Sequence, residues 1–323
     1  MKRLLSIGEA LIDFIAEETE RPVKDVDRFL GKVGGAPANV CAAYTVLGGE
    51  SALISQFGQD PFGDKIIDVL TRFGIDTHYV KRTDKANTSL AFVSLKADGN
   101  RDFSFYRNPG ADMLLKPDVI ASDWFSDAFA LHFCSVSLGN YPMKAAHDQA
   151  IDYATDAGTI VSFDPNIRLP LWPDESALRQ TILEYMPRAD LLKISDEELE
   201  FITGLTDIEE ALDRLFVGRV KLILYTEGAG GARAFTQSSC AADRGIRVAA
   251  TDTTGAGDGF IGSFLYQLSR DGVRREDLGQ LQGSVLKRYL MFSNQFCAYS
   301  VQRSGAMDSY GTEEAVKAAV GRG

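Results

Sequence analysis

Apolar and polar residues follow each other along this chain in two distinct patterns. Short apolar runs bounded by turn residues are typical of buried strands, and longer stretches with apolar residues on one face are typical of amphipathic helices. The short runs predict strands at Leu4–Ile7, Ser51–Phe57, Ala128–Phe133, Thr159–Phe163, Leu191–Ile194 and Val220–Tyr225. The longer stretches predict helices at Ala36–Leu47, Pro61–Phe73, Met143–Asp156, Ser176–Met186 and Asp196–Thr203.

The order of these elements indicates the fold class. Strands and helices alternate for most of the length, which favours an α/β fold with a mostly parallel sheet covered by helices on both faces. The later part of the chain is more helical, with helices expected over Gly257–Arg270 and around Leu281–Val301. No internal repeat, low-complexity tract or linker rich in Pro, Gly or Ser divides the sequence.

Residues 77–107 depart from this alternation. Ser89–Leu95 and Arg101–Tyr106 alternate apolar and polar positions with the period of a strand. Ala97–Asn100 between them contain an Asp-Gly pair, which is a strong signal for a hairpin turn. The hairpin is either a decoration at a sheet edge or a lid over a site, and the pattern is compatible with both.

The composition narrows the class of partner. Hydrophobic residues make up 45% and charged residues 24%, as in soluble globular enzymes, and the formal net charge of −11 comes without a Lys/Arg run. We therefore expect neither nucleic acid nor an anionic membrane as a partner. No window approaches the roughly 18 apolar residues of a membrane span. Glu9 and Asp13 interrupt the N-terminal apolar stretch too early for a signal peptide, so a cytoplasmic protein is expected.

The cysteines form no pattern of their own. Cys41, Cys134, Cys240 and Cys297 lie far apart, with no C-x-x-C pair and no His at ligand spacing. We therefore expect buried thiols that act as small hydrophobic side chains, in place of a structural zinc site or a Cys-His nucleophile.

The segment 247–270 carries the strongest chemical signal. A run of small residues stands between a short extended segment and an amphipathic helix, namely Thr254-Gly255-Ala256-Gly257-Asp258. Backbone N–H groups of Gly255, Ala256 and Gly257 can approach a phosphate at such a helix start, where the helix dipole also favours negative charge. Asp258 falls in the first turn, where a carboxylate can accept the proton of an attacking hydroxyl. The run therefore indicates phosphoryl transfer.

Three well-known sequence patterns fit this loop less well. The P-loop pattern G-x-x-x-x-G-K-[ST] occurs nowhere in the chain, which disfavours a P-loop NTPase. Gly257–Gly262 match G-x-G-x-x-G, but this match lies late in the chain with its last residues inside the helix, so we interpret it as coincidental. A simple helix cap spanning Asp252 to Asp258 would not need the additional glycines.

Two signatures together resemble the ribokinase-like (pfkB) carbohydrate kinases. Asp252–Asp258 resembles the C-terminal signature of that family and Gly34–Asn39 the N-terminal one, in the expected order. The resemblance covers nearly the whole chain. It implies a single ribokinase-like domain over 1–323, with a three-layer α/β/α fold and a small β lid at about 14–33 and 77–110. It also implies ATP-dependent phosphorylation of a sugar primary hydroxyl with Asp258 as catalytic base, in a monomer or homodimer.

Within the family the sequence is most similar to fructokinases, which implies conversion of fructose to fructose 6-phosphate. The similar stretches are Gly8–Asp13, Phe105–Asp112, Asp164–Trp172 and Ser195–Glu200. The resemblance implies that the sugar is bound by Asp13, Gly34, Gly35 and Asn39, with Asn39 orienting its own loop. Arg107 and Asn108 close over the sugar if the hairpin is a lid; otherwise Arg107 is an ordinary exposed arginine. Arg168 either neutralises the transferring phosphate or forms a structural salt bridge.

The resemblance also implies positions for the nucleotide and for ions. The implied nucleotide-binding residues are Lys193, Thr226, Glu227, Gly228, Gly255, Gly257 and Asn294. Glu198 aligns with the Glu of an N-x-x-E motif that organises Mg²⁺ through water, although Ser195 here replaces the Asn. A monovalent cation, usually K⁺, is implied beside the anion hole, with Asp252, Thr254 and the segment Val301–Ser309 as candidate ligands.

Two alternatives to a fructokinase stay open. A 2-keto-3-deoxygluconate kinase on the same scaffold would hold its acidic sugar with Arg107 and Tyr106. A catalytically inactive regulatory relative would show a damaged Gly-Ala-Gly-Asp loop, whereas Gly255–Asp258 are intact. A nucleoside kinase is more distant, because the sequence shows no clear set of aromatic residues for stacking a base.

Overall fold

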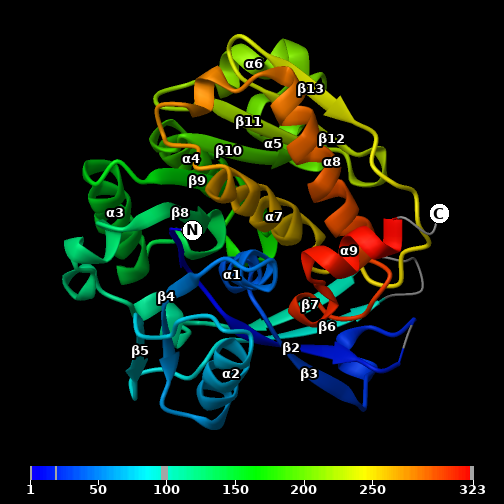
Figure 1. Cartoon of the computed structure of the whole chain (residues 1–323). Helices are drawn as coiled ribbons and strands as arrows, with labels where there is room; N and C mark the ends of the chain where they lie inside the picture. The colour runs from blue at the N-terminus through cyan, green and yellow to red at the C-terminus, as the bar shows by residue number, and fades with distance from the viewer. Residues whose placement is uncertain (1, 19, 96–100, 321–323) are drawn as a thin grey trace.

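The computed structural model describes residues 2–18, 20–95 and 101–320. Nine strands within these ranges form one large sheet in the order β13-β12-β11-β10-β9-β8-β1-β4-β5 (Figure 1). All neighbouring pairs are parallel except β11–β12 and β12–β13. The strands are β1 (Arg3–Ile7), β4 (Ser51–Gly58), β5 (Val80–Thr83), β8 (Ala128–Cys134), β9 (Ile160–Asp164), β10 (Leu191–Ser195), β11 (Leu222–Thr226), β12 (Ala232–Phe235) and β13 (Cys240–Asp243).

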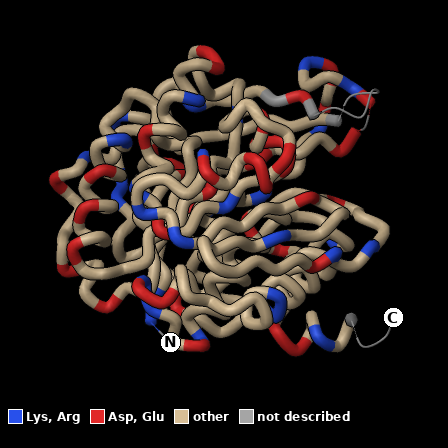
Figure 2. The backbone as a smooth tube through the Cα atoms, turned by 90° about the horizontal axis from the view of Figure 1, so that it is seen from above, with Lys and Arg blue, Asp and Glu red and all other residues tan. Residues whose placement is uncertain are grey.

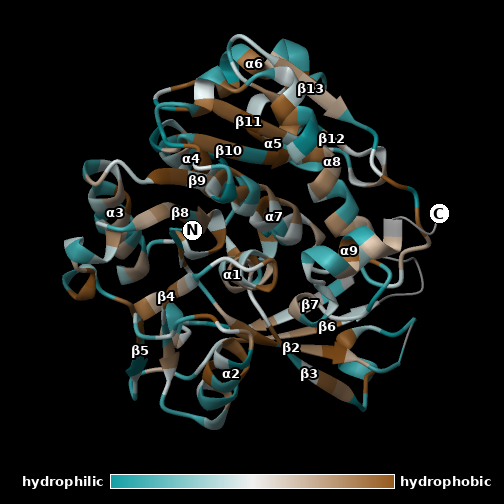
Figure 3. Cartoon of the chain, viewed as in Figure 1, coloured by the Kyte–Doolittle hydropathy of each residue, from teal (hydrophilic) through white to brown (hydrophobic). Residues whose placement is uncertain are grey.

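Helices cover both faces of this sheet, as predicted. Successive strand residues point to opposite faces, so Leu4 and Leu191 enter one core while Leu5 and Leu192 enter the other. The strands β8 to β11 are accordingly apolar along most of their length (Figure 3). The first core holds α1 (Ala36–Val46), α2 (Pro61–Arg72), α7 (Ala256–Arg270), α8 (Gly283–Ser300) and α9 (Glu313–Val320). The second holds α3 (Pro142–Asp156), α4 (Glu175–Tyr185), α5 (Asp196–Thr203) and α6 (Ile208–Leu215).

A second, smaller sheet lies beside the large one, in the order β3-β2-β6-β7. Its strands are β2 (Leu11–Ala16), β3 (Phe29–Gly34), β6 (Leu90–Leu95) and β7 (Arg101–Tyr106). The predicted hairpin is confirmed, with Leu90 opposite Tyr106, while its turn at 97–100 lies outside the described residues. The sheet is mixed, because β2 runs parallel to β6. One face of the small sheet packs on α2. The rings of Phe14 and Phe62 lie edge to face there, with their centroids 5.7 Å apart.

The predicted strands and helices are confirmed to within two residues at each end. The boundaries of the small sheet differ from those predicted. The sheet starts at Leu11, before 14, and Val80–Thr83 pair with β4 in the large sheet. The elements β12, β13, α6 and α9 were not predicted; the two strands have four residues each, too few for a clear period-two pattern. Cys240 is exposed and Cys297 is only partly buried, so the prediction of buried thiols is correct for Cys41 and Cys134 alone.

Charged residues of both signs are interspersed over the whole chain trace (Figure 2). This distribution matches the absence of a Lys/Arg run in the sequence. In the described part of the chain, no helix combines the length and the apolar character that a membrane crossing requires.

Candidate active site

A cavity of about 580 Å³ lies where the small sheet meets the carboxyl ends of the central strands. Glu9 follows β1, Asp164 ends β9 and Lys193 stands near the end of β10, and all three line the cavity. Ligands of open α/β sheets gather at this edge. The cavity is also lined by residues that the sequence predicted for the site, namely Asp13, Gly35, Asn39, Arg168, Asp252, Thr254 and Gly255–Asp258.

Asp258 lies in the first turn of α7 and is held by a residue of the other signature. Nδ2 of Asn39 donates a hydrogen bond of 2.8 Å to Oδ2 of Asp258. Burial raises the pKa of the Asp258 carboxyl to about 6, although the Asn39 hydrogen bond and the charges of Arg168 and Lys193 act against this shift. A carboxylate with such a pKa can accept a proton near neutral pH.

The turn before α7 depends on Gly255. Its backbone is left-handed, with φ of 77°, and a Cβ there would stand 2.7 Å from Cβ of Ala306 and 2.8 Å from the hydroxyl of Tyr310. That hydroxyl donates to the Gly255 carbonyl at 2.7 Å. The Ala256 amide donates to the Thr253 carbonyl at 3.2 Å, so the turn uses one of the three amides predicted for the anion hole. The amides that follow in the first turn have no partner within the helix and point toward its open end.

One side of the cavity is built from β2 and from the segment that follows β3. Asp13 is half-buried on β2, and a Cβ on Gly34 would stand 2.1 Å from its Oδ2. Gly35 has φ of 109°, and a Cβ there would stand 2.6 Å from the Glu9 carbonyl oxygen. The two glycines therefore let β3 and α1 approach the Asp13 carboxylate and the Glu9 backbone closely.

Two cationic side chains line the cavity opposite Asp13. Nζ of Lys193 lies 3.1 Å from Oδ2 of Asp164, and both side chains are buried. Burial disfavours the charged lysine, but Asp164 and Glu198 outweigh it and hold the pKa of Lys193 above its ordinary value. Arg168 is exposed and donates from Nη1 to the Ile167 carbonyl at 2.8 Å. Within the described residues Arg168 forms no ion pair, which disfavours the structural salt bridge.

Several predicted residues do not line this cavity. Glu198 accepts the Ile167 and Ser195 amides, each at 2.9 Å, and so joins the loop after β9 to the start of α5. Asn294 donates to Oδ2 of Asp243 at 2.7 Å, which ties α8 to β13. Thr226–Gly228 follow β11, the neighbour of β10. None of these residues is among those that line the cavity.

Arg107 and Asn108 also lie outside the lining. The Arg107 side chain is only 3% exposed, and its Nε donates to Oδ2 of Asp112 at 2.9 Å. The interpretation of Arg107 as an ordinary exposed arginine is therefore wrong, and Arg107 is not among the residues that line the cavity. Asn108 is exposed, and Tyr106 is 65% exposed on the outer surface.

The loop that precedes α7 is tied to the segment that follows α8. Oδ1 of Asp252 accepts the Thr254 amide and Oδ2 accepts the Gly305 amide, both at 2.9 Å. The Thr251 amide donates to the Val301 carbonyl at 2.7 Å. Both predicted sources of cation ligands are thus brought together, although no group of three His, Cys, Asp or Glu side chains in the described ranges is arranged for a metal.

Glu9 and Asp164 are site residues that sequence reasoning missed. Both line the cavity and both are buried. Asp164 directly follows the predicted strand Thr159–Phe163, and the tendency of ligands to gather at the carboxyl ends of parallel strands could have selected it. Glu9 carried no separate signal, because its neighbourhood of small and apolar residues does not reveal which group it faces.

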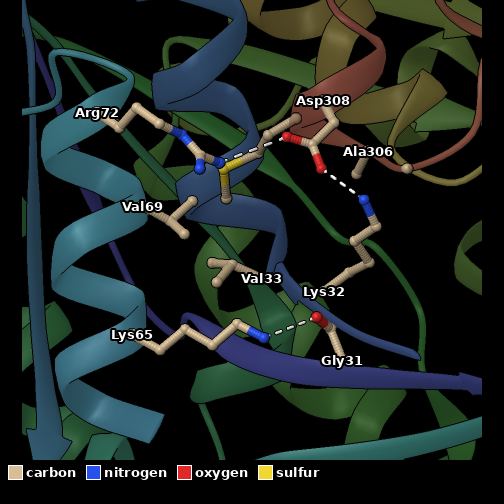
Figure 4. Close-up of a pocket in the computed structure, with 10 residues that line it drawn as sticks. Gly31, Lys32, Val33, Lys65, Val69, Arg72, Ala306 and Asp308 are labelled. Carbon is tan, nitrogen blue, oxygen red and sulfur yellow. Dashed lines mark hydrogen bonds and ion pairs between the residues drawn. The ribbon is translucent and has the colours of Figure 1, made fainter. Parts of the chain in front are cut away.

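A second hollow, of about 180 Å³, lies between β3, α2 and the segment 305–308 (Figure 4). Oδ2 of Asp308 accepts Nζ of Lys32 at 2.9 Å, and Oδ1 lies 3.7 Å from Nη2 of Arg72. Nζ of Lys65 donates to the Gly31 carbonyl at 2.8 Å. These side chains tie the outer strand of the small sheet to the segment that contacts Gly255.

The chain is similar to known proteins over most of its length. A family model described as pfkB family carbohydrate kinase matches residues 1–313. The probable fructokinase-5 of Arabidopsis thaliana is 41% identical over 310 residues, which are 96% of this chain and 94% of that protein. The fructokinase of Xylella fastidiosa with bound ATP superposes with a TM-score of 0.91 at 33% identity, covering 99% of this chain and 98% of that one.

A further solved structure is a double mutant of the Vibrio cholerae O395 fructokinase with fructose, ADP and a potassium ion bound. It superposes with a TM-score of 0.86 at 33% identity, and 98% of each chain is covered. The ribokinase-like fold is therefore confirmed. The intact phosphate loop, the match over most of the sequence and these neighbours make the protein a sugar kinase, and the chain belongs to the pfkB family of carbohydrate kinases.

Proposed function

We propose that this kinase transfers the γ-phosphoryl group of ATP to the primary hydroxyl on C6 of fructose and releases fructose 6-phosphate and ADP, with Asp258 as catalytic base. The hydrogen bond from Asn39 to Asp258 carries this proposal, because it joins the sugar side of the cavity to the phosphate loop at one carboxylate. The side-chain oxygen of Asn39, Oδ1, is buried without a hydrogen-bond partner among the described residues. A buried orphan acceptor beside Asp258 suits a sugar hydroxyl.

The sugar binds between Asp13, Gly34, Gly35 and Asn39, with its primary hydroxyl toward Asp258. The carboxylate of Asp258 takes the hydroxyl proton as the oxygen attacks in line. The first amides of α7 and the Arg168 guanidinium stabilise charge on the transferring group. The small sheet excludes water, which would otherwise hydrolyse the nucleotide.

ATP lies along the sheet edge, toward Lys193, Thr226–Gly228 and Asn294, and its binding is supported by the ATP-bound Xylella fastidiosa relative. Mg²⁺ would be held mainly by the phosphates of the nucleotide and by waters, since it keeps several waters and needs only one or two carboxylates, and it would neutralise phosphate charge. Glu198 already accepts two backbone amides, so its role toward the ion runs through water. Asp252, Thr254 and the segment 301–305 would supply the ligands of a K⁺ ion that stiffens the loop before α7, and the Vibrio cholerae relative holds a potassium ion.

The positions of two side chains favour fructose over 2-keto-3-deoxygluconate as the acceptor. Arg107 is buried against Asp112 and Tyr106 faces outward, so neither clamps an acidic sugar in the cavity. A coupled assay of ATP consumption with fructose, ribose, 2-keto-3-deoxygluconate and adenosine tests the acceptor. Fructose is expected to give the highest kcat/KM, and a higher value for any other acceptor overturns the assignment.

A further inference from the structure

Arg107 belongs to a buried polar cluster that also contains Glu9, Ser89, Asp112 and Ser137, here named the hinge cluster. The side chains of Arg107 and Asp112 are 3% and 1% exposed. Two nitrogens of the guanidinium, Nε and Nη2, donate to Oδ2 of Asp112, and Nη2 also donates to Oγ of Ser137 at 3.0 Å. Oγ of Ser137 in turn donates a hydrogen bond of 2.7 Å to Oε2 of Glu9. Oγ of Ser89 donates to Oδ1 of Asp112.

The hinge cluster lies where the chain crosses between the two sheets. Glu9 stands in the crossing from β1 to β2, Ser89 immediately before β6 and Arg107 immediately after β7. The remaining crossing, from β3 to α1, runs through Gly35, which packs against the Glu9 backbone. Three of the four crossings of the described chain therefore contribute a side chain to the hinge cluster, and the fourth packs against the backbone of one of its members, Glu9.

The electrostatics of the hinge cluster favour one arrangement. Burial lowers the pKa of Arg107, but the Asp112 and Glu9 carboxylates outweigh it and hold that pKa above the ordinary value. A planar guanidinium that binds a carboxylate through two nitrogens fixes direction as well as distance. An apolar replacement of a buried ion pair is often no less stable, so the pair need not be present for stability alone.

We propose that the hinge cluster fixes the angle of the small sheet over the cavity, and that Arg107 and Asp112 are positioning residues for sugar binding. Glu9 and Val136, which Arg107 contacts through the Val136 carbonyl at 3.1 Å, both line the cavity. Glu9 lies in the short segment that leads into β2, and Asp13 lies on β2 four residues later. A shift of Glu9 therefore moves the Asp13 carboxylate with it. The sugar part of this inference rests on the proposed function.

Asp112→Asn tests the hinge cluster against a matched control, Asp190→Asn. Asp190 is also buried and also faces arginine, with Arg275 Nε at 3.0 Å, but it precedes β10 at the opposite end of the strands. Asp112→Asn is expected to raise the KM for the sugar roughly tenfold, as for loss of a charged hydrogen bond, with the KM for ATP nearly unchanged. Asp190→Asn is expected to leave both KM values unchanged. Equal effects of the two variants on the sugar KM would overturn the proposal.

Amide hydrogen exchange of the protein without ligands gives a second measurement, which needs no activity. Asp112→Asn should speed exchange in Leu11–Ala16 roughly tenfold while leaving Leu222–Thr226 unchanged. Unchanged amide exchange in Leu11–Ala16 of this variant would refute the proposed role of the hinge cluster, even if the enzyme is active. Conversely, if the wild type phosphorylates no sugar, the proposed function fails while this exchange result still decides the hinge.

A milder pair of variants covers the case in which Asp112→Asn does not fold. Ser89→Ala removes one hydrogen bond to Asp112 and leaves the ion pair intact. Ser6→Ala removes a bond from another buried serine, to the His132 carbonyl at 3.3 Å, outside the hinge cluster. Faster exchange in Leu11–Ala16 is expected for Ser89→Ala only, and its absence would contradict the proposal.

Discussion

Nδ2 of Asn39 donates a hydrogen bond of 2.8 Å to Oδ2 of Asp258, across 219 positions of sequence. The bond connects α1, which starts beside Gly34 and Gly35, with α7, which starts at the phosphate loop. It therefore fixes the carboxylate at the point where the two halves of the cavity meet. The sequence assigned Asn39 to the ordering of its own loop and did not reveal this partner.

Asp258→Asn should lower kcat by about a thousandfold while sugar affinity stays within about two-fold, because only proton acceptance is lost. Steady-state kinetics and titration calorimetry with the sugar measure the two effects. Asp207→Asn is the matched control, since Asp207 caps α6 through the Glu209 amide at 2.7 Å, far from the cavity. Near-normal turnover of Asp258→Asn would show that this carboxylate merely caps its helix.

In a plot of kcat/KM against pH, the decrease on the acid side should have its midpoint near pH 6. Burial raises the pKa of Asp258 to about 6, and only the ionised carboxylate accepts a proton. Below that pH the rate should fall about tenfold per pH unit. Asn39→Ala removes a donor that favours the ionised form, so its acid limb should move to higher pH. A limb that stays in place, or that moves to lower pH, would argue against Asn39 as a partner of the base.

Gly255→Ala should lose both stability and activity. The substitution combines a left-handed φ of 77° with contacts of 2.7 and 2.8 Å, so we expect a cost of about 2 kcal/mol or more. Gly272→Ala has a similar φ of 68° but no atom within 4 Å of its Cβ, and it should cost about 1 kcal/mol without loss of turnover. Denaturant unfolding and kcat separate the two, and equal losses would place the effect in backbone strain alone.

Replacing K⁺ by tetramethylammonium should lower kcat about five-fold or more if a cation stiffens the loop before α7. Asp252→Asn should raise the K⁺ concentration needed for half-maximal turnover, because it weakens the bonds to Thr254 and Gly305 that bring the two segments together. Initial rates at constant ionic strength give both values. Identical turnover in the two cations would remove K⁺ from the proposed function.

Asp308→Asn should change the free energy of unfolding by less than about 1 kcal/mol, since its partners Lys32 and Arg72 are partly exposed. The difference from wild type should shrink further in high salt. Chemical denaturation at low and high ionic strength measures it. If Asp308→Asn lowered the free energy of unfolding more than Asp112→Asn does, the exposed ion pairs of Asp308, and not the buried pair of Arg107 and Asp112, would hold the small sheet.

Local patterns in the sequence predicted most of the elements that frame the site. Strand and helix periods depend on neighbouring residues, and the phosphate loop is a contiguous run, so both are visible in one dimension. Short strands such as β12 and β13 were not predicted, because much of the stability of a strand comes from the strands with which it pairs. The parallel pairing of β2 with β6 escaped for the same reason.

The sequence by itself determined the α/β fold, the two signatures and the place of the Asp258 carboxylate in the first turn after the run of small residues. Tertiary structure alone decided which polar groups meet: Asn39 with Asp258, Lys193 with Asp164, and Arg107 with Asp112 away from the cavity. The physical reason is that burial and charge pairing depend on residues distant in sequence. The same arginine would bind a sugar on an exposed lid, but here it is enclosed where the chain crosses between the sheets.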